Sequence, residues 1–115
     1  MPEVASSEGP MPGQLLIERR AEDDRIVVSL RGELDLTSVP EFERELREAE
    51  ATNPSHLVLD LSGLDFMDST GLRALLQARE RAKADGHELT LRRGPRQVQR
   101  VLELTKTLDV FNFED

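Results

Sequence analysis

Apolar positions along the chain follow two spacings, one typical of strands and one typical of helices. Compact runs rich in leucine and β-branched residues predict strands over 14–18, 25–31, 56–61, 88–93 and 110–113. Apolar residues three and four apart, with charged residues between them, predict helices over 39–49, 70–83 and 95–104. The order β-β-α-β-α-β-α-β predicts an α/β fold with a mixed β-sheet of about five strands, against which the helices pack.

Polar residues mark where these elements begin and end. The run 21–24 is a turn that joins the first two strands as a hairpin, and 32–35 (Gly-Glu-Leu-Asp) breaks the strand pattern. Thr37 and Ser38 offer N-caps for the first helix, and Asn53 with Pro54 ends it. A turn is expected over 62–67, and Gly86 is expected to stop the second helix.

Residues 1–13 differ in composition from the rest of the chain. They are rich in Pro, Gly, Ser and Glu, which predicts a disordered leader before a single domain over 14–115. The leader lacks the basic and apolar regions of a signal peptide, and no window is long and apolar enough for a membrane span. With no cysteine in the chain, these features predict a cytoplasmic protein that has no contact with membrane.

The charge balance narrows the classes of partner. Fifteen basic and 23 acidic residues give a net charge of −8, which repels nucleic acid, and four phenylalanines are too few for base stacking. The two histidines, His56 and His87, do not have the spacing of a metal site. We therefore expect no nucleic acid, no metal and no cofactor.

The most informative segment is 57–76, in which a buried strand and an acidic turn precede Asp68-Ser69-Thr70-Gly71 at the start of a helix. N-capping is the common role of residues such as Asp68 or Ser69 before a helix, and local sequence alone favours it. Two adjacent hydroxyls exceed what a cap needs, however, and Gly71 lets another backbone approach closely. A helix N-terminus also favours a phosphate, so Ser69 is a candidate phosphorylation site.

Two motifs resemble those of STAS domains, specifically of the bacterial anti-sigma factor antagonists. Asp68-Ser69-Thr70-Gly71-Leu72, preceded by Phe66 and Met67, is similar to the family signature, and Gly32-Glu33-Leu34-Asp35 is similar to a second family feature. The order of the predicted elements also follows the family from Leu15 to Phe113. Members often end with a fourth helix, whereas this sequence stops after the last predicted strand, so one face of the sheet is expected to be less covered.

The resemblance implies a partner-switching protein that is not an enzyme. It implies that an anti-sigma factor serine kinase phosphorylates Ser69, with Thr70 as a second acceptor, and that a serine phosphatase resets the switch. The unphosphorylated form would bind the kinase and free a sigma factor. The residues implied in partner binding lie in the two motifs and beside them: Gly32, Glu33, Asp35, Phe66, Met67, Asp68, Ser69, Thr70 and Gly71.

Alternative interpretations remain open at this level. Asp35 is equally well accounted for by its place before a helix, and Asp60 by solvation at a strand end. An aspartyl-phosphate receiver with Asp60 as acceptor is disfavoured because two strands open the chain. A hydrolase is disfavoured because Ser69 lacks a Gly-x-Ser-x-Gly setting. A non-switching STAS subunit of a stressosome or lipid-transport complex keeps the fold and changes the role. The basic group Arg92, Arg93 and Arg96 is expected to be solvated.

Overall fold

The computed structural model describes residues 14–114, and the predicted leader lies outside them. The elements follow in the order β1 (Leu15–Glu22), β2 (Arg25–Leu34), α2 (Val39–Glu50), β3 (His56–Met67), α3 (Ser69–Asp85), β4 (Glu88–Arg92), α4 (Arg96–Leu104), the 3-10 turn η1 (Leu108–Val110) and β5 (Phe113–Glu114).

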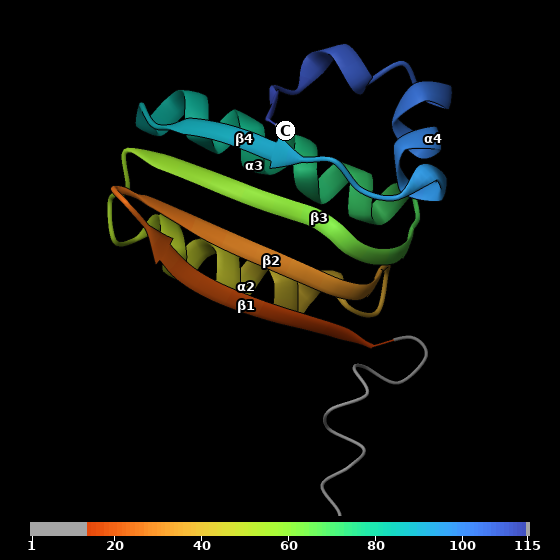
Figure 1. The fold of residues 1–115 in the computed structure, drawn as a ribbon, viewed down its shortest axis with the longest axis horizontal. Coiled ribbons are helices and arrows are strands. Elements are labelled where there is room, and N and C mark those ends of the chain that lie inside the picture. Colours follow the sequence, from red (N-terminus) through yellow and green to blue (C-terminus); the bar gives the residue numbers. More distant parts are fainter. Residues whose placement is uncertain (1–13, 115) are drawn as a thin grey trace, which may run out of the picture.

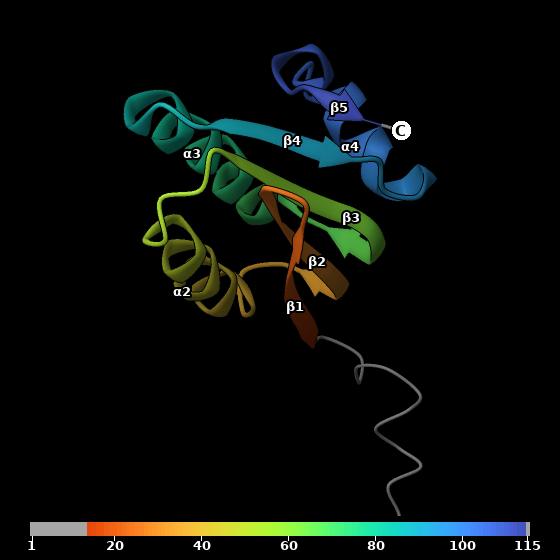
Figure 2. The same cartoon turned by 60° about the vertical axis from the view of Figure 1, so that its left-hand side comes forward.

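One sheet organises these elements, with the strands in the spatial order β1-β2-β3-β4-β5 (Figures 1 and 2). β1 and β2 are antiparallel, and every other neighbouring pair is parallel. The mixed sheet of five strands and the predicted order of strands and helices are therefore confirmed. Because β2 and β3 run in parallel, their carboxyl ends lie at the same edge of the sheet, where each leads into a helix.

The hairpin of β1 and β2 is longer than the sequence suggested. β1 continues to Glu22, which pairs with Arg25 across a turn of two residues. Asp23 takes the left-handed conformation that such a turn requires, with a φ of 59°. The second half of β1, residues 19–22, carries mostly exposed polar side chains, so it lacks the apolar run that predicts a strand.

The turn predicted over 62–67 is wrong, because β3 continues as a strand to Met67 beside β2. The pairing shifts twice along this stretch, so β3 bulges and bends away from regular alternation. Gly63 allows the close crossing, since a Cβ there would lie 2.6 Å from Arg31 Cγ. Gly32, which was expected to break β2, lies within that strand at a φ of 107°. These glycines permit bulges in a continuous ladder.

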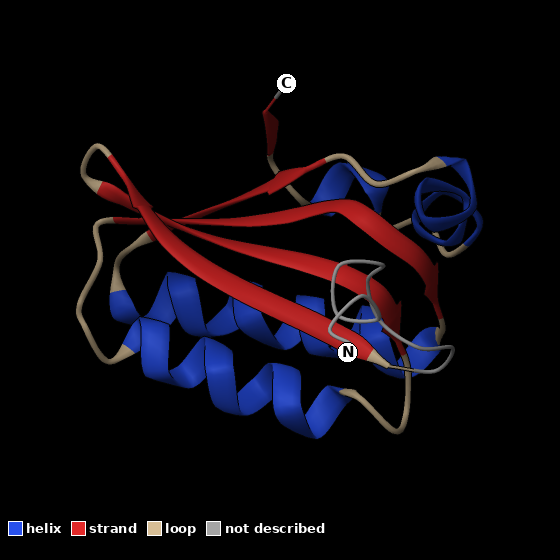
Figure 3. Ribbon diagram, turned by 60° about the horizontal axis from the view of Figure 1, so that its bottom comes forward, coloured by secondary structure: helices blue, strands red, loops and turns tan. Residues whose placement is uncertain are grey.

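The core lies between the sheet and the helices. α2 and α3 lie side by side against one face, and α4 lies at the end of the sheet where β3 bends (Figure 3). α2 buries Phe42, Leu46 and Ala49, as their helical spacing predicts. Gly86 ends α3 with a φ of 81°, and its amide donates to the Ala82 carbonyl, which confirms the predicted stop.

The last strand is shorter and later than predicted. Residues 108–110 form a 3-10 turn, and only Phe113 and Glu114 pair with β4. Phe111, from the predicted strand, is instead buried in the core. A short apolar run does not distinguish a strand from a segment that only contributes a core side chain.

The sheet face opposite α2 and α3 carries a network of charged side chains. Arg92 donates to Glu22 at 2.7 Å and to Glu114 at 2.8 Å, and Arg25 donates to the same two carboxylates at 3.0 and 2.7 Å. The expectation that Arg92 is solvated is therefore wrong. Hydrogen bonds from Arg92 and then Arg25 lower the pKa of Glu22 to about 2.

Buried apolar residues lie on the same face of the sheet as this network. Val27 and Val58 point away from the helices by strand alternation, pair in register, and are fully buried. Long arginine side chains can shield such positions with their methylene stems while their guanidinium groups bind carboxylates. Such arginine stems would account for the burial of Val27 and Val58 on a face that α2 and α3 do not cover.

Candidate functional site at the start of α3

Ser69 is the first residue of α3 and is exposed at the edge where β2 and β3 end. The bent end of β3 delivers the chain to this point, and Asp68 separates the strand from the helix. Within residues 14–114 the Ser69 hydroxyl has no hydrogen-bond partner. A free hydroxyl on an exposed helical turn is sterically accessible to another protein.

Asp68 is the N-cap of α3. Its carboxylate accepts from the Gly71 amide at 3.0 Å and from the Thr70 hydroxyl, while its carbonyl accepts from the Leu72 amide at 3.0 Å. Burial raises the pKa of the Asp68 carboxyl, but the hydrogen bonds from Thr70, Gly71 and Leu36 outweigh it and hold that pKa below its ordinary value. The cap is therefore a charged carboxylate at neutral pH.

Asp68 also joins the two sequence motifs. Its amide donates to the Leu34 carbonyl at 3.3 Å, and the Leu36 backbone binds its carboxylate. Leu34 and Met67, which end β2 and β3, are partners in the ladder. The segments 32–35 and 68–72 are therefore neighbours in space, as parallel strands with a shared edge require.

Asp35 shapes the turn that leads into α2. Its carboxylate accepts from the Thr37 amide at 3.1 Å, the Thr37 hydroxyl at 2.8 Å and the Ser38 amide at 3.2 Å. Ser38 occupies the N-cap position, but its hydroxyl donates to the Glu33 carbonyl at 2.7 Å and does not cap the helix. The carboxylate of Asp35 is thus already engaged in local structure.

Three predicted contact residues are buried. Met67 is only 2% exposed and belongs to the core, so its side chain offers a partner no surface. Gly32 is buried within β2, and Gly71 is buried where α3 meets the end of that strand. A Cβ on Gly71 would lie 2.6 Å from the Leu34 carbonyl oxygen, so the packing of α3 itself requires glycine there.

Two large apolar side chains are exposed beside Ser69. Phe66 is 47% exposed and precedes the cap, and Leu36 is 70% exposed on the turn whose backbone contacts Asp68. Sequence reasoning included Phe66 but missed Leu36. The sequence feature that could have identified Leu36 is its position immediately after the Gly-Glu-Leu-Asp motif, outside any strand or helix. Exposed apolar groups at one site mark candidate contacts for a protein partner.

The remaining predicted residues contribute less surface. Glu33 is half-buried, and its amide donates to the Gln14 carbonyl at 2.9 Å. Thr70 is half-buried, with its hydroxyl committed to Asp68. Asp60 lies within β3, accepts from the Ser62 amide at 3.0 Å and lies 3.9 Å from Arg92. Asp60 is therefore engaged in local contacts within the sheet.

The described residues contain no cluster of three or more His, Asp or Glu side chains that could hold a metal ion. Within the same part of the chain, no helix combines the length and hydropathy needed to cross a bilayer.

Comparison with known proteins gives consistent similarities. The family model for the STAS domain matches residues 17–115. The anti-sigma-F factor antagonist RsfB of Mycobacterium tuberculosis is 40% identical over 55 residues, which cover 48% of this chain and 45% of that protein. The match thus spans less than half the length of RsfB.

Two further matches cover most of both chains. The anti-sigma-B factor antagonist of Staphylococcus aureus is 27% identical over 101 residues, covering 88% of this chain and 94% of that protein. The crystal structure of an anti-sigma factor antagonist from Mycobacterium paratuberculosis superposes with a TM-score of 0.79 at 27% identity, covering 90% of this chain and 87% of the other.

Proposed function

Because the chain belongs to the STAS domain family, we propose that it is an anti-sigma factor antagonist that switches partners through phosphorylation of Ser69. The unphosphorylated protein binds an anti-sigma factor that is also a serine kinase, and this binding frees a sigma factor. Phosphorylation ends the complex, and a serine phosphatase restores it. The chain supplies the acceptor hydroxyl and catalyses nothing, and it works in the cytoplasm.

The observation that carries this proposal is the exposed hydroxyl of Ser69, which has no hydrogen-bond partner among residues 14–114 and lies near the exposed Leu36 and Phe66. A kinase must bring the acceptor oxygen in line with the terminal phosphate of ATP, which requires a hydroxyl that is free to move. Exposed apolar side chains near the acceptor give the kinase a surface to bind. Similarity to proteins named as anti-sigma factor antagonists supports the identity of the partner class.

Ser69 is favoured over Thr70 as the acceptor. The Thr70 hydroxyl donates to the Asp68 carboxylate and is half-buried, so phosphorylating it would break part of the N-cap. The Ser69 hydroxyl can be modified without losing any hydrogen bond within residues 14–114. We therefore treat Thr70 as a secondary site at most.

Electrostatic repulsion explains how phosphorylation of Ser69 would end the complex with the partner. A phosphoserine adds about two negative charges at neutral pH, beside the charged carboxylate of Asp68. In water this repulsion is about 1 kcal/mol per pair of unit charges at contact distance, and it rises severalfold when a partner excludes solvent. A loss of about 3 kcal/mol weakens binding more than a hundredfold. The free protein can therefore tolerate a phosphate that the complex cannot.

The first experiment is phosphorylation by a candidate serine kinase from the same genome with Mg-ATP, followed by intact mass and peptide mapping. We expect one phosphate on Ser69, none on Ser69→Ala, and continued modification of Thr70→Ala. Modification that persists in Ser69→Ala would refute Ser69 as the acceptor. No modification, with a kinase shown to be active on another substrate, would favour a non-switching STAS subunit.

Binding of the same kinase then tests the switch. We expect Ser69→Glu to weaken binding about tenfold or more, since it places a charge next to Asp68. Ser55→Glu is the matched control, because Ser55 is exposed and precedes β3 at the strand end opposite Ser69. Equal losses in both variants would mean that total charge matters and that the position of the phosphate does not.

A further inference from the structure

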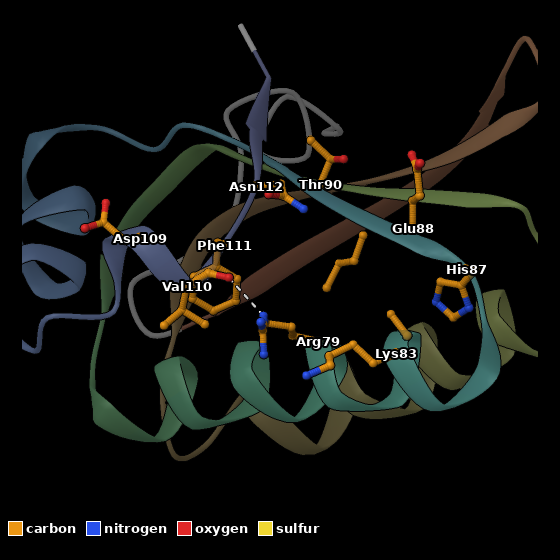
Figure 4. Close-up of a pocket in the computed structure, with 11 residues that line it drawn as sticks. Arg79, Lys83, His87, Glu88, Thr90, Asp109, Val110, Phe111 and Asn112 are labelled. Carbon is orange, nitrogen blue, oxygen red and sulfur yellow. Dashed lines mark hydrogen bonds between the residues drawn. The ribbon is translucent and has the colours of Figure 1, made fainter.

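A cavity of about 650 Å³ lies at the end of the molecule opposite Ser69. Its walls are the C-terminal half of α3, the chain from His87 into β4, and the segment 109–112, which begins within η1 (Figure 4). We call it the basic cavity, after Arg79, Lys83 and His87 in its wall. Its size falls in the range of about 300–1,000 Å³ found for small-molecule sites.

Two cations on α3 face this cavity. Arg79 and Lys83 are four residues apart, so they lie on the same side of the helix, and like charges at that spacing repel. The Arg79 Nε–H donates to the Val110 carbonyl at 2.9 Å, which holds the guanidinium against the wall. Lys83 is exposed and makes no ion pair with any residue between 14 and 114. Lys83 therefore brings an uncompensated positive charge to a protein with a net charge of −8.

The β4 wall offers two further polar groups. His87 Nε2 is buried and has no hydrogen-bond partner among the described residues. The Leu91 amide donates to the Asn112 carbonyl on this side of β4, so strand alternation turns the Leu89 amide the same way. β4 pairs with β5 only through Leu91 and Arg92, which leaves the edge at Leu89 without a strand in the described part of the chain.

One of the two cations is already paired, because Arg79 Nη1 donates to the Glu80 carboxylate at 3.1 Å, whereas Lys83 has no ion pair within residues 14–114. Glu88 also lines the cavity, but its carboxylate lies 3.6 Å from His56 Nδ1. In Figure 4 the side chains of Glu88 and Asp109 point away from the space between Arg79 and Lys83. The cavity therefore presents positive and hydrogen-bond-donating groups, with Val110 and Phe111 as an apolar wall.

We propose that the basic cavity binds a small organic anion with an apolar body. Its carboxylate or phosphate ester is held by Arg79, Lys83 and His87, while its body rests on Val110 and Phe111. Binding would neutralise the unpaired charge of Lys83 and satisfy the buried His87 nitrogen. This site is separate from Ser69 and does not depend on partner switching.

The test is an NMR titration of the purified, isotope-labelled chain without any kinase, so its outcome is independent of the proposed function. The probes are phenyl phosphate, benzoate and inorganic phosphate, with chloride at matched ionic strength. We expect saturable shifts at the amides of His87–Thr90 and Val110–Asn112 with phenyl phosphate or benzoate, and weaker binding of inorganic phosphate, which has no apolar body. The tighter of the first two probes identifies the head group.

Substitution of Lys83 makes the test specific. Lys83→Met keeps most of the side chain's length, removes its charge, and should weaken binding about fivefold through loss of one charge-assisted contact. Arg44→Met is the matched control, because Arg44 is an exposed cation on α2 and should leave binding unchanged. Shifts that chloride reproduces, shifts that do not saturate, or equal affinity in Lys83→Met would overturn the proposal.

Discussion

Gly71→Ala tests whether the glycine of the second motif serves the fold or the partner. Helix propensity alone predicts that alanine in α3 stabilises the protein by about 1 kcal/mol. Packing predicts the opposite, since the new Cβ would lie 2.6 Å from the Leu34 oxygen and 2.8 Å from Met67 Cγ. The first contact is about 0.8 Å shorter than an ordinary one, and a backbone oxygen cannot rotate away as a side chain does.

The magnitude follows from these opposing effects. Overpacking of a core contact costs about 1–3 kcal/mol, and a shift of α3 would also stretch the bond from Asp68 to the Leu34 carbonyl, already 3.3 Å long. We expect a net loss of about 1–2 kcal/mol, which for a domain of this size lowers the melting temperature by about 5–10 °C.

Urea unfolding followed by circular dichroism measures this loss. Ser69→Ala is the control, because it changes the same helical turn without a new contact and should stay within about 0.5 kcal/mol of the wild type. A Gly71→Ala protein as stable as the wild type, or more stable, would refute the packing argument. If a Gly71→Ala protein of unchanged stability were no longer phosphorylated, the role of Gly71 would be to let the kinase approach Ser69.

Three further predictions concern the cap, the charged face and the contact surface. Asp68→Ala should cost about 1–2 kcal/mol in urea unfolding, whereas Asp68→Asn keeps an acceptor oxygen and should cost clearly less; equal costs would contradict the cap's role. Ion pairs, led by that with Arg92, lower the pKa of Glu22 to about 2 from 4.5, so its stabilisation is complete above pH 4.5 and is lost as the pH falls toward about 2. Glu22→Gln should flatten the pH dependence of stability in that window, and an unchanged slope would count against the network. Leu36→Ala should leave stability within about 0.5 kcal/mol of the wild type but weaken kinase binding about tenfold, measured by titration calorimetry; unchanged affinity would remove Leu36 from the interface.

The sequence predicted the fold well where one spacing dominated. Phe42, Leu46 and Ala49 lie on the buried side of α2, because residues three and four apart share one side of a helix but would fall on both faces of a strand. The end of β3 was missed because Leu61, Leu64 and Met67 are all buried but lie three residues apart, as two bulges require. That spacing does not match a regular strand, and glycine in such a stretch resembles a turn signal.

The candidate site was predicted in part. The type of residue at Asp68 and its place before a helix were enough to predict the N-cap, because capping depends on neighbours in sequence. The exposure of Leu36 and the burial of Met67 could not be predicted, because they depend on where the ends of β2 and β3 meet. The charged network of Glu22, Arg92 and Glu114 was missed for the same reason, since its members come from three strands.

The contacts that fix the start of α3 explain how a modification at Ser69 could act without refolding the protein. The groups that fix the start of α3 are Asp68, Gly71 and the end of β2, and each has its hydrogen bonds or contacts without the Ser69 hydroxyl. A phosphate at Ser69 would therefore leave the cap and the packing of α3 intact. Its effect would fall on a partner that covers Leu36 and Phe66, because only there is its charge forced out of water beside Asp68. Phosphorylated protein should accordingly keep its unfolding free energy within about 1 kcal/mol while losing its partner, and a large loss of stability on phosphorylation would instead indicate a switch that works by unfolding α3.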